Sequence, residues 1–186
     1  ATGQILVDEP TIGESDRDRY VISSLMEEAI ASSILEGAAT TRKKAKEMLR
    51  EGRKPKTRGE RMIQHNYATM RKIKDHVSEE LSVELLCELQ ESITAGTLED
   101  ASASGRLRRP DEDVMVVDVV DGTVLHNPPD AGLLKDRLKL MCDFANESKS
   151  TGFIHPVIKG IILHFWLAYE HPFVDGNGRT ARAIFY

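Results

Sequence analysis

Twelve residues near the end of the chain carry side chains and glycines suited to phosphate chemistry. The stretch reads HPFVDGNGRTAR over residues 171–182. Gly176 and Gly178, on either side of Asn177, let backbone N–H groups turn toward an anion, and a helix that starts there adds its own unpaired N–H donors. A glycine-rich loop before a helix is typical of a phosphate-binding cradle.

The charged side chains of this stretch extend the prediction to a polyphosphate and a metal ion. Arg179 and Arg182 are three residues apart, so they are expected on one face of the helix, where guanidinium forks fit phosphate oxygens. Asp175 offers an oxygen to Mg²⁺, which usually takes one or two carboxylates plus substrate phosphates. His171 titrates near neutral pH, as a general base must, and Asn177 is expected to donate to a phosphate oxygen.

The elements that position these residues are predicted to be mostly helices. Apolar residues recur at spacings of three and four. This pattern predicts helices over residues 16–36, 41–51, 60–76, 82–93, 130–147, 156–170 and from 178 onward. The one strand signal is the β-branched run 114–120, which an Asp121-Gly122 turn joins to residues 123–125. The fold class is therefore mostly α with one β-hairpin.

Aromatic residues gather close to the same stretch, and we expect them to form its support. Eight of the ten aromatic side chains lie between Phe144 and Tyr186. Phe173 is predicted to pack beneath the loop. The others on the preceding helix are predicted to form a densely packed platform under the site: Phe165, Trp166 and Tyr169.

Composition narrows the class of protein. The chain has 186 residues, of which 40% are apolar and 30% charged, with a net charge of −5, the balance of a folded domain in water. We expect no membrane segment, because no apolar run approaches the roughly 18 residues of a spanning helix, and there is no signal-peptide pattern. The acidic excess argues against direct nucleic-acid binding. Cys87 and Cys142 lie in apolar helical patterns, which indicates reduced core thiols and a cytoplasmic location.

The twelve-residue stretch resembles the signature of the Fic domain family. HPFVDGNGR-x-x-R matches H-x-F-x-[D/E]-G-N-G-R-x-x-R at every defined position. Further features are also similar to those of Fic proteins: the hairpin, Pro128-Pro129, the helix after this pair, and residues 153–156, which lead into the helix before the motif. The resemblance implies a Fic-type helical bundle with a β-hairpin flap. It divides the chain into an arm over residues 1–15, an N-terminal helical region over 16–80 and a catalytic core over 81–186, which we expect to be truncated at its C-terminus.

The resemblance also implies an activity. Fic enzymes move AMP from ATP to a hydroxyl side chain of a target protein. By motif position, His171 would be the general base and Asp175 would hold Mg²⁺ between the α- and β-phosphates. Asn177, with the amides around Gly176 and Gly178, would hold those phosphates. Magnesium and ATP are thus the implied cofactor and co-substrate.

A second resemblance implies a brake on this activity. By motif position Arg179 would contact the β-phosphate and Arg182 the γ-phosphate. Residues 32–37, SSILEG, fit the inhibitory motif [S/T]-x-x-x-E-[G/N] of Fic proteins, and Ser32 and Glu36 are four apart on one helix face. In the family this glutamate pairs with the second motif arginine. Glu36 would therefore occupy Arg182, and residues 16–37 would be an inhibitory helix.

The hairpin is the implied docking site for the target protein, held by strand addition at an open edge. The flap residues assigned to this role are Val114, Val116, Val117, Asp118, Val119 and Val120. The target protein is not named by the sequence, and association into a homo-oligomer stays open.

Other reactions on the same scaffold remain alternatives. Doc-like relatives phosphorylate their targets and carry Lys where this chain has Gly178, so Gly178 favours AMP transfer. Relatives also transfer UMP or phosphocholine, and some with the inhibitory glutamate remove AMP, a reaction in which Glu36 would orient water. A non-catalytic ATP-binding regulator would need a degraded motif, and this motif is intact.

Overall fold

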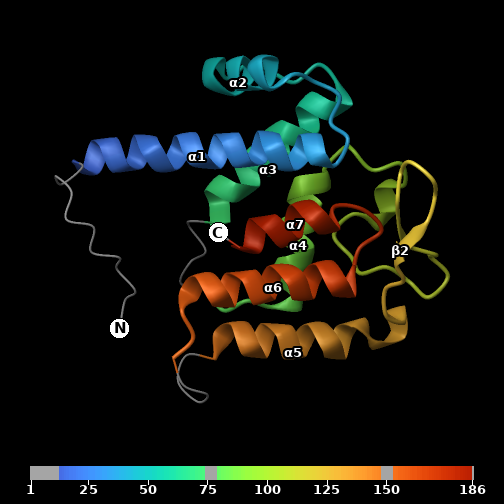
Figure 1. Ribbon diagram of the computed structural model, residues 1–186. Coiled ribbons are helices and arrows are strands. Elements are labelled where there is room, and N and C mark those ends of the chain that lie inside the picture. The colour runs from blue at the N-terminus through green and yellow to red at the C-terminus, as the bar shows by residue number, and fades with distance from the viewer. Residues whose placement is uncertain (1–12, 74–78, 148–152, 186) are drawn as a thin grey trace.

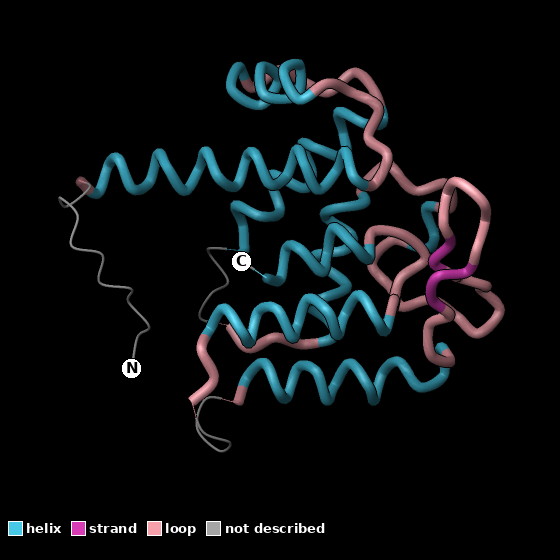
Figure 2. Tube along the Cα trace, in the orientation of Figure 1, coloured by secondary structure: helices cyan, strands magenta, loops and turns pink. Residues whose placement is uncertain are grey.

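The computed structural model describes residues 13–73, 79–147 and 153–185, and helices dominate these segments (Figure 1). The helices are α1 (Glu14–Leu35), α2 (Arg42–Glu51), α3 (Arg58–Ile73), α4 (Val83–Thr94), α5 (Leu134–Asn146), α6 (Pro156–Glu170) and α7 (Asn177–Phe185). Two short antiparallel strands, β1 (Val116–Val117) and β2 (Val124–His126), form the hairpin (Figure 2). The predicted class, mostly α with one hairpin, is confirmed. The predicted arm up to residue 12 and the last turn of the third helix, 74–76, lie outside the described residues.

Local sequence accounts for several helix starts. Thr41 and Ser82 each accept a hydrogen bond from the backbone N–H three residues further on, as N-caps do. Asp130 caps a 3-10 turn, η3 (Ala131–Leu133), which leads directly into α5. Pro156 lies in the first turn of α6, where its missing N–H costs nothing. No helix among the described residues is long and apolar enough to cross a membrane.

The core consists of two main apolar clusters and a smaller one between them. One cluster comes from α4 to α7 and the loop before α7: Leu86, Leu138, Met141, Cys142, Leu163, Leu167, Phe173 and Ala181. Another comes from α1 to α3 and the α1–α2 connection: Met26, Ile30, Ala38, Ala45, Met48, Met62 and Ile63. The third joins them: Leu25, Ala29, Met70, Ile93 and Ala183. Helix α7 packs on α1, α3, α4 and α6, so this helix lies at the centre of the molecule.

The hairpin is shorter than its sequence pattern predicts. The predicted strand 114–120 is wrong in length, because the chain leaves the β1 ladder at Asp118. The Asp118 carboxylate accepts the Val120 N–H, and Asp121 accepts the Thr123 N–H, so side chains replace strand bonds. The connection therefore runs from Asp118 to Thr123 instead of being a two-residue turn. The flap residues outside the strand are Val114, Asp118, Val119 and Val120.

Candidate active site

His171 ends helix α6 in an unusual backbone conformation. Its φ of 45° and ψ of 57° are left-handed, and it is the one non-glycine residue with positive φ in the described segments. Its Nδ1 lies 3.3 Å from the carbonyl oxygen of Ala168. A carbonyl only accepts, so Nδ1 is the donor and Nε2 keeps its lone pair. Burial lowers the pKa of His171 below its usual value, which keeps the ring neutral and able to accept a proton at pH 7.

A cavity of about 400 Å³ lies beside this imidazole. Its lining comes from the hairpin, from α6 and from the start of α7: Val116, His126, Phe165, Ala168, Tyr169, His171 and Gly178. The predicted aromatic platform is therefore only partly correct. Phe165 is 69% and Tyr169 45% exposed, and both line the cavity instead of the core. His126 stacks on Tyr169 at 4.8 Å between ring centroids.

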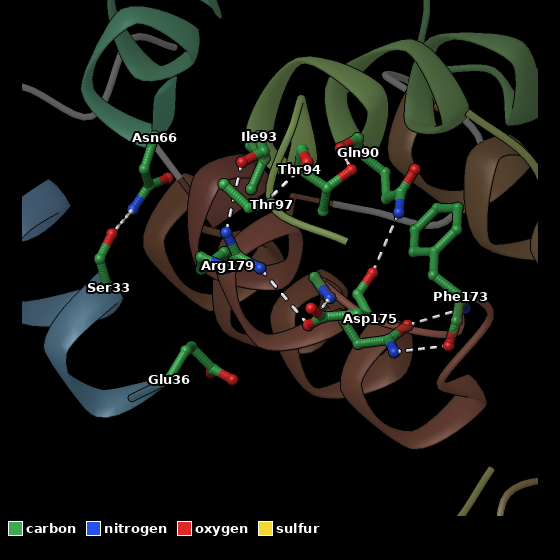
Figure 3. A network of polar contacts seen from close by, with 12 residues as sticks. Ser33, Glu36, Asn66, Gln90, Ile93, Thr94, Thr97, Phe173, Asp175 and Arg179 are labelled. Atoms are coloured by element: carbon green, nitrogen blue, oxygen red, sulfur yellow. Dashed lines mark hydrogen bonds and ion pairs between the residues drawn. The ribbon is translucent and has the colours of Figure 1, made fainter. Parts of the chain in front are cut away.

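The loop before α7 is held rigid by its own polar side chains (Figure 3). The Oδ1 of Asn177 accepts the Phe173 N–H at 2.9 Å, and its Nδ2 donates to the Phe173 carbonyl at 2.8 Å. Asn177 is 3% exposed, and its side chain braces the loop, while its predicted bond to a phosphate oxygen stays a prediction. Phe173 is fully buried, as expected. Gln90 donates to the Asp175 carbonyl at 3.0 Å and fixes the loop to α4.

Asp175 and Arg179 are bonded to each other beneath the start of α7. Arg179 is completely buried and donates to the Ile93 carbonyl at 3.3 Å and to the Asp175 carboxylate at 3.4 Å (Figure 3). Arg182, one turn further along α7, keeps 18% of its side chain exposed. Burial lowers the pKa of Arg179, and its Nε has no partner. The arginine therefore orients the carboxylate from below.

The residues present fit a magnesium ion of the kind that is shared with phosphates. The Asp175 side chain is 38% exposed, and its Oδ2 lies 3.9 Å from the nearest Arg58 nitrogen, outside hydrogen-bond distance. One oxygen is thus available, and Mg²⁺ needs only one or two carboxylates when phosphates complete its shell. No cluster of three or more acidic, His or Cys side chains suited to a metal occurs in the described segments. The donor set therefore suits a metal that arrives with a nucleotide.

Glu36 and Arg182 meet across the molecule, as the sequence predicts. An Arg182 terminal nitrogen donates to Glu36 Oε1 at 2.5 Å, and its Nε donates to the Ser32 hydroxyl at 2.7 Å. A Cβ placed on Gly178 would lie 2.1 Å from the same Glu36 oxygen. The carboxylate from α1 therefore lies directly on the first turn of α7, where the helix presents N–H donors.

Two residues of the site were missed by sequence reasoning. Arg108, in a segment predicted only as a loop, donates through Nε to the His171 carbonyl at 2.9 Å. Glu170 is fully buried and accepts two bonds from Arg137, at 2.7 and 2.8 Å, and one from Trp166 at 3.1 Å. Glu170 directly precedes His171, and a carboxylate inside an apolar helix was the available signal.

Comparison with known proteins agrees with this geometry. The sequence model of the Fic/DOC family matches residues 80–186. Among curated proteins, "Protein adenylyltransferase Fic" of Drosophila willistoni is 39% identical over 59 residues, which are 32% of this chain and 12% of that protein. The Drosophila melanogaster protein of the same name is 40% identical over 65 residues, 35% of this chain and 12% of that protein. The matches thus span a small part of these relatives.

Solved structures show the same fold. A Fic domain containing signaling protein from Bacteroides thetaiotaomicron superposes with a TM-score of 0.77 at 22% identity, over 92% of this chain and 64% of that one. Fic-1 from C. elegans gives 0.66 at 22% identity, over 96% and 51%. IbpAFic2 in complex with adenylylated Cdc42 gives 0.53 at 18% identity, over 95% and 54%. At these identities the likeness concerns the fold.

Proposed function

Because the chain belongs to the Fic/DOC family, we propose that it is a protein adenylyltransferase, which moves AMP from ATP to a hydroxyl side chain of a target protein. One observation carries the proposal. The neutral His171, with Nε2 free to accept a proton, lines the same cavity as Gly178 at the start of the anion-binding helix. Base and phosphate cradle are therefore adjacent, as a transfer to phosphorus requires.

The transfer follows from the placement of these groups. His171 takes the proton from the target hydroxyl, whose oxygen forms a bond to the α-phosphorus of ATP while the bond to the pyrophosphate oxygen breaks. The N–H groups at the start of α7 hold the phosphates, and Arg182 binds the terminal phosphate once it is free of Glu36. Asp175, oriented by Arg179, would hold Mg²⁺, which supplies charge neutralisation when bound.

Glu36 acts as a brake in this proposal. Its carboxylate bonds the guanidinium that a terminal phosphate needs and lies on Gly178, so it fills the cradle with negative charge. A polyphosphate is then repelled or held in a non-productive position. Ser32 supports the arrangement through its bond to Arg182. The catalytic core of the proposal is residues 81–186, and the N-terminal helical region, residues 16–80, carries the brake.

The target protein is proposed to bind along the hairpin. The sheet formed by β1 and β2 has two strands in the described part of the chain, which leaves an outer edge on each for strand addition. Val116 of β1 lines the cavity beside His171, so a segment added there would bring its side chains to the base. The complex of IbpAFic2 with adenylylated Cdc42 supports a protein target for this chain as well. A cytoplasmic location is proposed from the free thiols Cys87 and Cys142.

The test is AMP incorporation by two variants. Glu36→Gly is expected to label itself or an added protein with the α-phosphate of ATP in the presence of Mg²⁺, well above the unaltered chain, because Arg182 becomes available. Adding His171→Ala should lower this labelling at least about 100-fold, because a general base contributes about that much to the rate. Glu47→Gly, at an exposed position of α2, is the matched control and should leave labelling unchanged.

Mass spectrometry of the Glu36→Gly protein with each nucleoside triphosphate separates the alternatives. A gain of one AMP supports the proposal, and a gain of one UMP or one phosphate would replace it by another transfer. If Glu36→Gly labels no more than the unaltered chain while His171→Ala still lowers that level, the brake assignment is wrong and the transferase assignment stands.

A further inference from the structure

Arg108 is a buried arginine, and most of its bonds reach the backbone around His171. It is 7% exposed. Its Nε donates to the His171 carbonyl at 2.9 Å, and a terminal nitrogen reaches the Glu170 carbonyl at 3.5 Å. Its own backbone N–H donates to the Pro172 carbonyl at 2.8 Å. One residue therefore contacts three consecutive peptide groups at the end of α6.

These contacts are made where the backbone needs support. The last carbonyl groups of a helix have no partner within it and form its negative end. His171 adds a left-handed conformation that a residue with a side chain rarely adopts. The Arg108 guanidinium supplies both donors and positive charge at this point. It thereby fixes the orientation of the His171 side chain relative to the backbone.

The same guanidinium also holds the base of the hairpin. A terminal nitrogen of Arg108 donates to the carbonyl of Pro129 at 2.5 Å, three residues after β2 ends. The hairpin and His171 line one cavity. Arg108 therefore connects the element proposed to receive the target with the element that carries the base.

We propose that Arg108 is a positioning residue for the transfer: it sets the distance between the flap and His171 so that a hydroxyl held on the flap meets Nε2. The inference rests on the proposed function. It explains why a buried arginine donates its bonds both to the His171 carbonyl and to the Pro129 carbonyl after the hairpin. A displacement of about 1 Å at a reacting group is enough to lower a rate about 100-fold.

The charge of Arg108 also acts on His171. The groups that bear on the ring are Arg108 from the loop, His126 from the hairpin and Glu36 from α1. Burial is the largest cause of the lowered pKa of His171. The bond to the Ala168 carbonyl raises this pKa, His126 and Arg108 lower it, and Glu36 raises it. Loss of the Arg108 charge is therefore expected to raise the pKa of His171 and to move the acid limb of activity to higher pH.

The experiment compares Arg108→Gln and Arg108→Lys in the Glu36→Gly background, with Arg109→Gln as the matched control, since Arg109 is the exposed neighbour. Arg108→Gln should lower the rate at saturating ATP about 100-fold and leave ATP affinity, measured by calorimetry, within about twofold. Arg108→Lys keeps the positive charge but loses the several N–H donors of the guanidinium. Its transfer rate should therefore fall less, and the acid limb of its pH–rate profile should not move. Arg109→Gln should change neither.

An NMR titration of the His171 ring, assigned with His171→Ala, gives a readout independent of activity. The His171 pKa should rise in Arg108→Gln and stay unchanged in Arg108→Lys and Arg109→Gln. The proposal is overturned if Arg108→Gln leaves both the pKa of His171 and the transfer rate per folded molecule unchanged. If Arg108→Gln does not fold, an Arg108→Lys protein as fast as Arg109→Gln overturns it. If the Glu36→Gly parent transfers no AMP, the proposed function fails, and the titration still decides whether Arg108 acts on His171.

Discussion

At the scale of single residues, the site depends on two glycines whose missing side chains serve different purposes. Gly176 has a φ of +89°, and a Cβ there would lie 2.7 Å from the methyl carbon of Thr94. Gly178 has ordinary helical backbone, and its Cβ would meet the ends of the Glu36 and Arg182 side chains, which can move. Gly176 is needed by the fold, and Gly178 leaves room for the Glu36 carboxylate.

This difference predicts unequal costs for the same substitution. Gly176→Ala should lower the free energy of unfolding by about 2 kcal/mol, because strain and collision add up. Gly178→Ala should change it by less than about 1 kcal/mol, because alanine favours the helix and Glu36 can rotate away. Urea denaturation of both variants is the measurement, and equal losses would contradict the assignment.

What the sequence could predict at this scale depended on whether a motif names the residue. Glu36 and Arg182, 146 residues apart, were paired correctly because the family motifs name both positions. Arg108, 63 residues from His171, was missed because no motif named it, and nothing distinguishes it in sequence from its arginine neighbours. The bonds of Asn177 to Phe173 were not predicted, because an amide's residue type does not say whether it faces the loop or a ligand. Only the burial of its side chain decides that.

At the scale of elements, helices were predictable to within a few residues and the hairpin was not. Helix α6 begins and ends where its proline and its apolar pattern indicate, because both signals are local. The ladder of β1 is shortened by Asp118, whose side chain competes with strand bonds. Competition of this kind depends on geometry that alternating residue types do not reveal.

The end of α6 relies on one buried carboxylate, which yields a prediction for this element. Arg137→Met leaves the fully buried Glu170 without its two strongest bonds, and this should cost about 3 kcal/mol of stability. Because the loss comes from the unpaired charge, Arg137→Met combined with Glu170→Met should recover much of it. Thermal unfolding of the single and double variants tests this, and a double variant less stable than Arg137→Met refutes it.

At the scale of the whole molecule, α1, the helix that carries the proposed brake, is also a part of the core. Ala29 and Ile30 of α1 are fully buried, and Asn66 of α3 donates to the Ala29 carbonyl at 3.3 Å. Departure of the whole helix would expose this apolar surface to water, at about 25 cal/mol per Å². Release of Arg182 is therefore expected to be a local movement at the end of α1, around Glu36 and Gly37.

Residues 16–80 and residues 81–186 each contain a carboxyl group whose contribution to stability is expected to be lost in acid. Glu60, at the start of α3, accepts bonds from Arg53 and from the Lys56 N–H, and these lower its pKa from the usual 4.5 to about 2. Glu112, in the segment that carries Arg108, has its pKa lowered to about 2 by Arg106 and the Arg109 N–H. A carboxyl whose pKa is lower in the folded state stabilises the fold above its unfolded value, and this stabilisation is lost as the pH falls from about 4.5 to 2. Stability measured by urea denaturation should thus decrease over this window. Glu60→Gln and Glu112→Gln should each reduce the slope of the free energy of unfolding against pH. If both variants and the unaltered chain show the same slope, neither the Glu60–Arg53 pair nor the Glu112–Arg106 pair contributes.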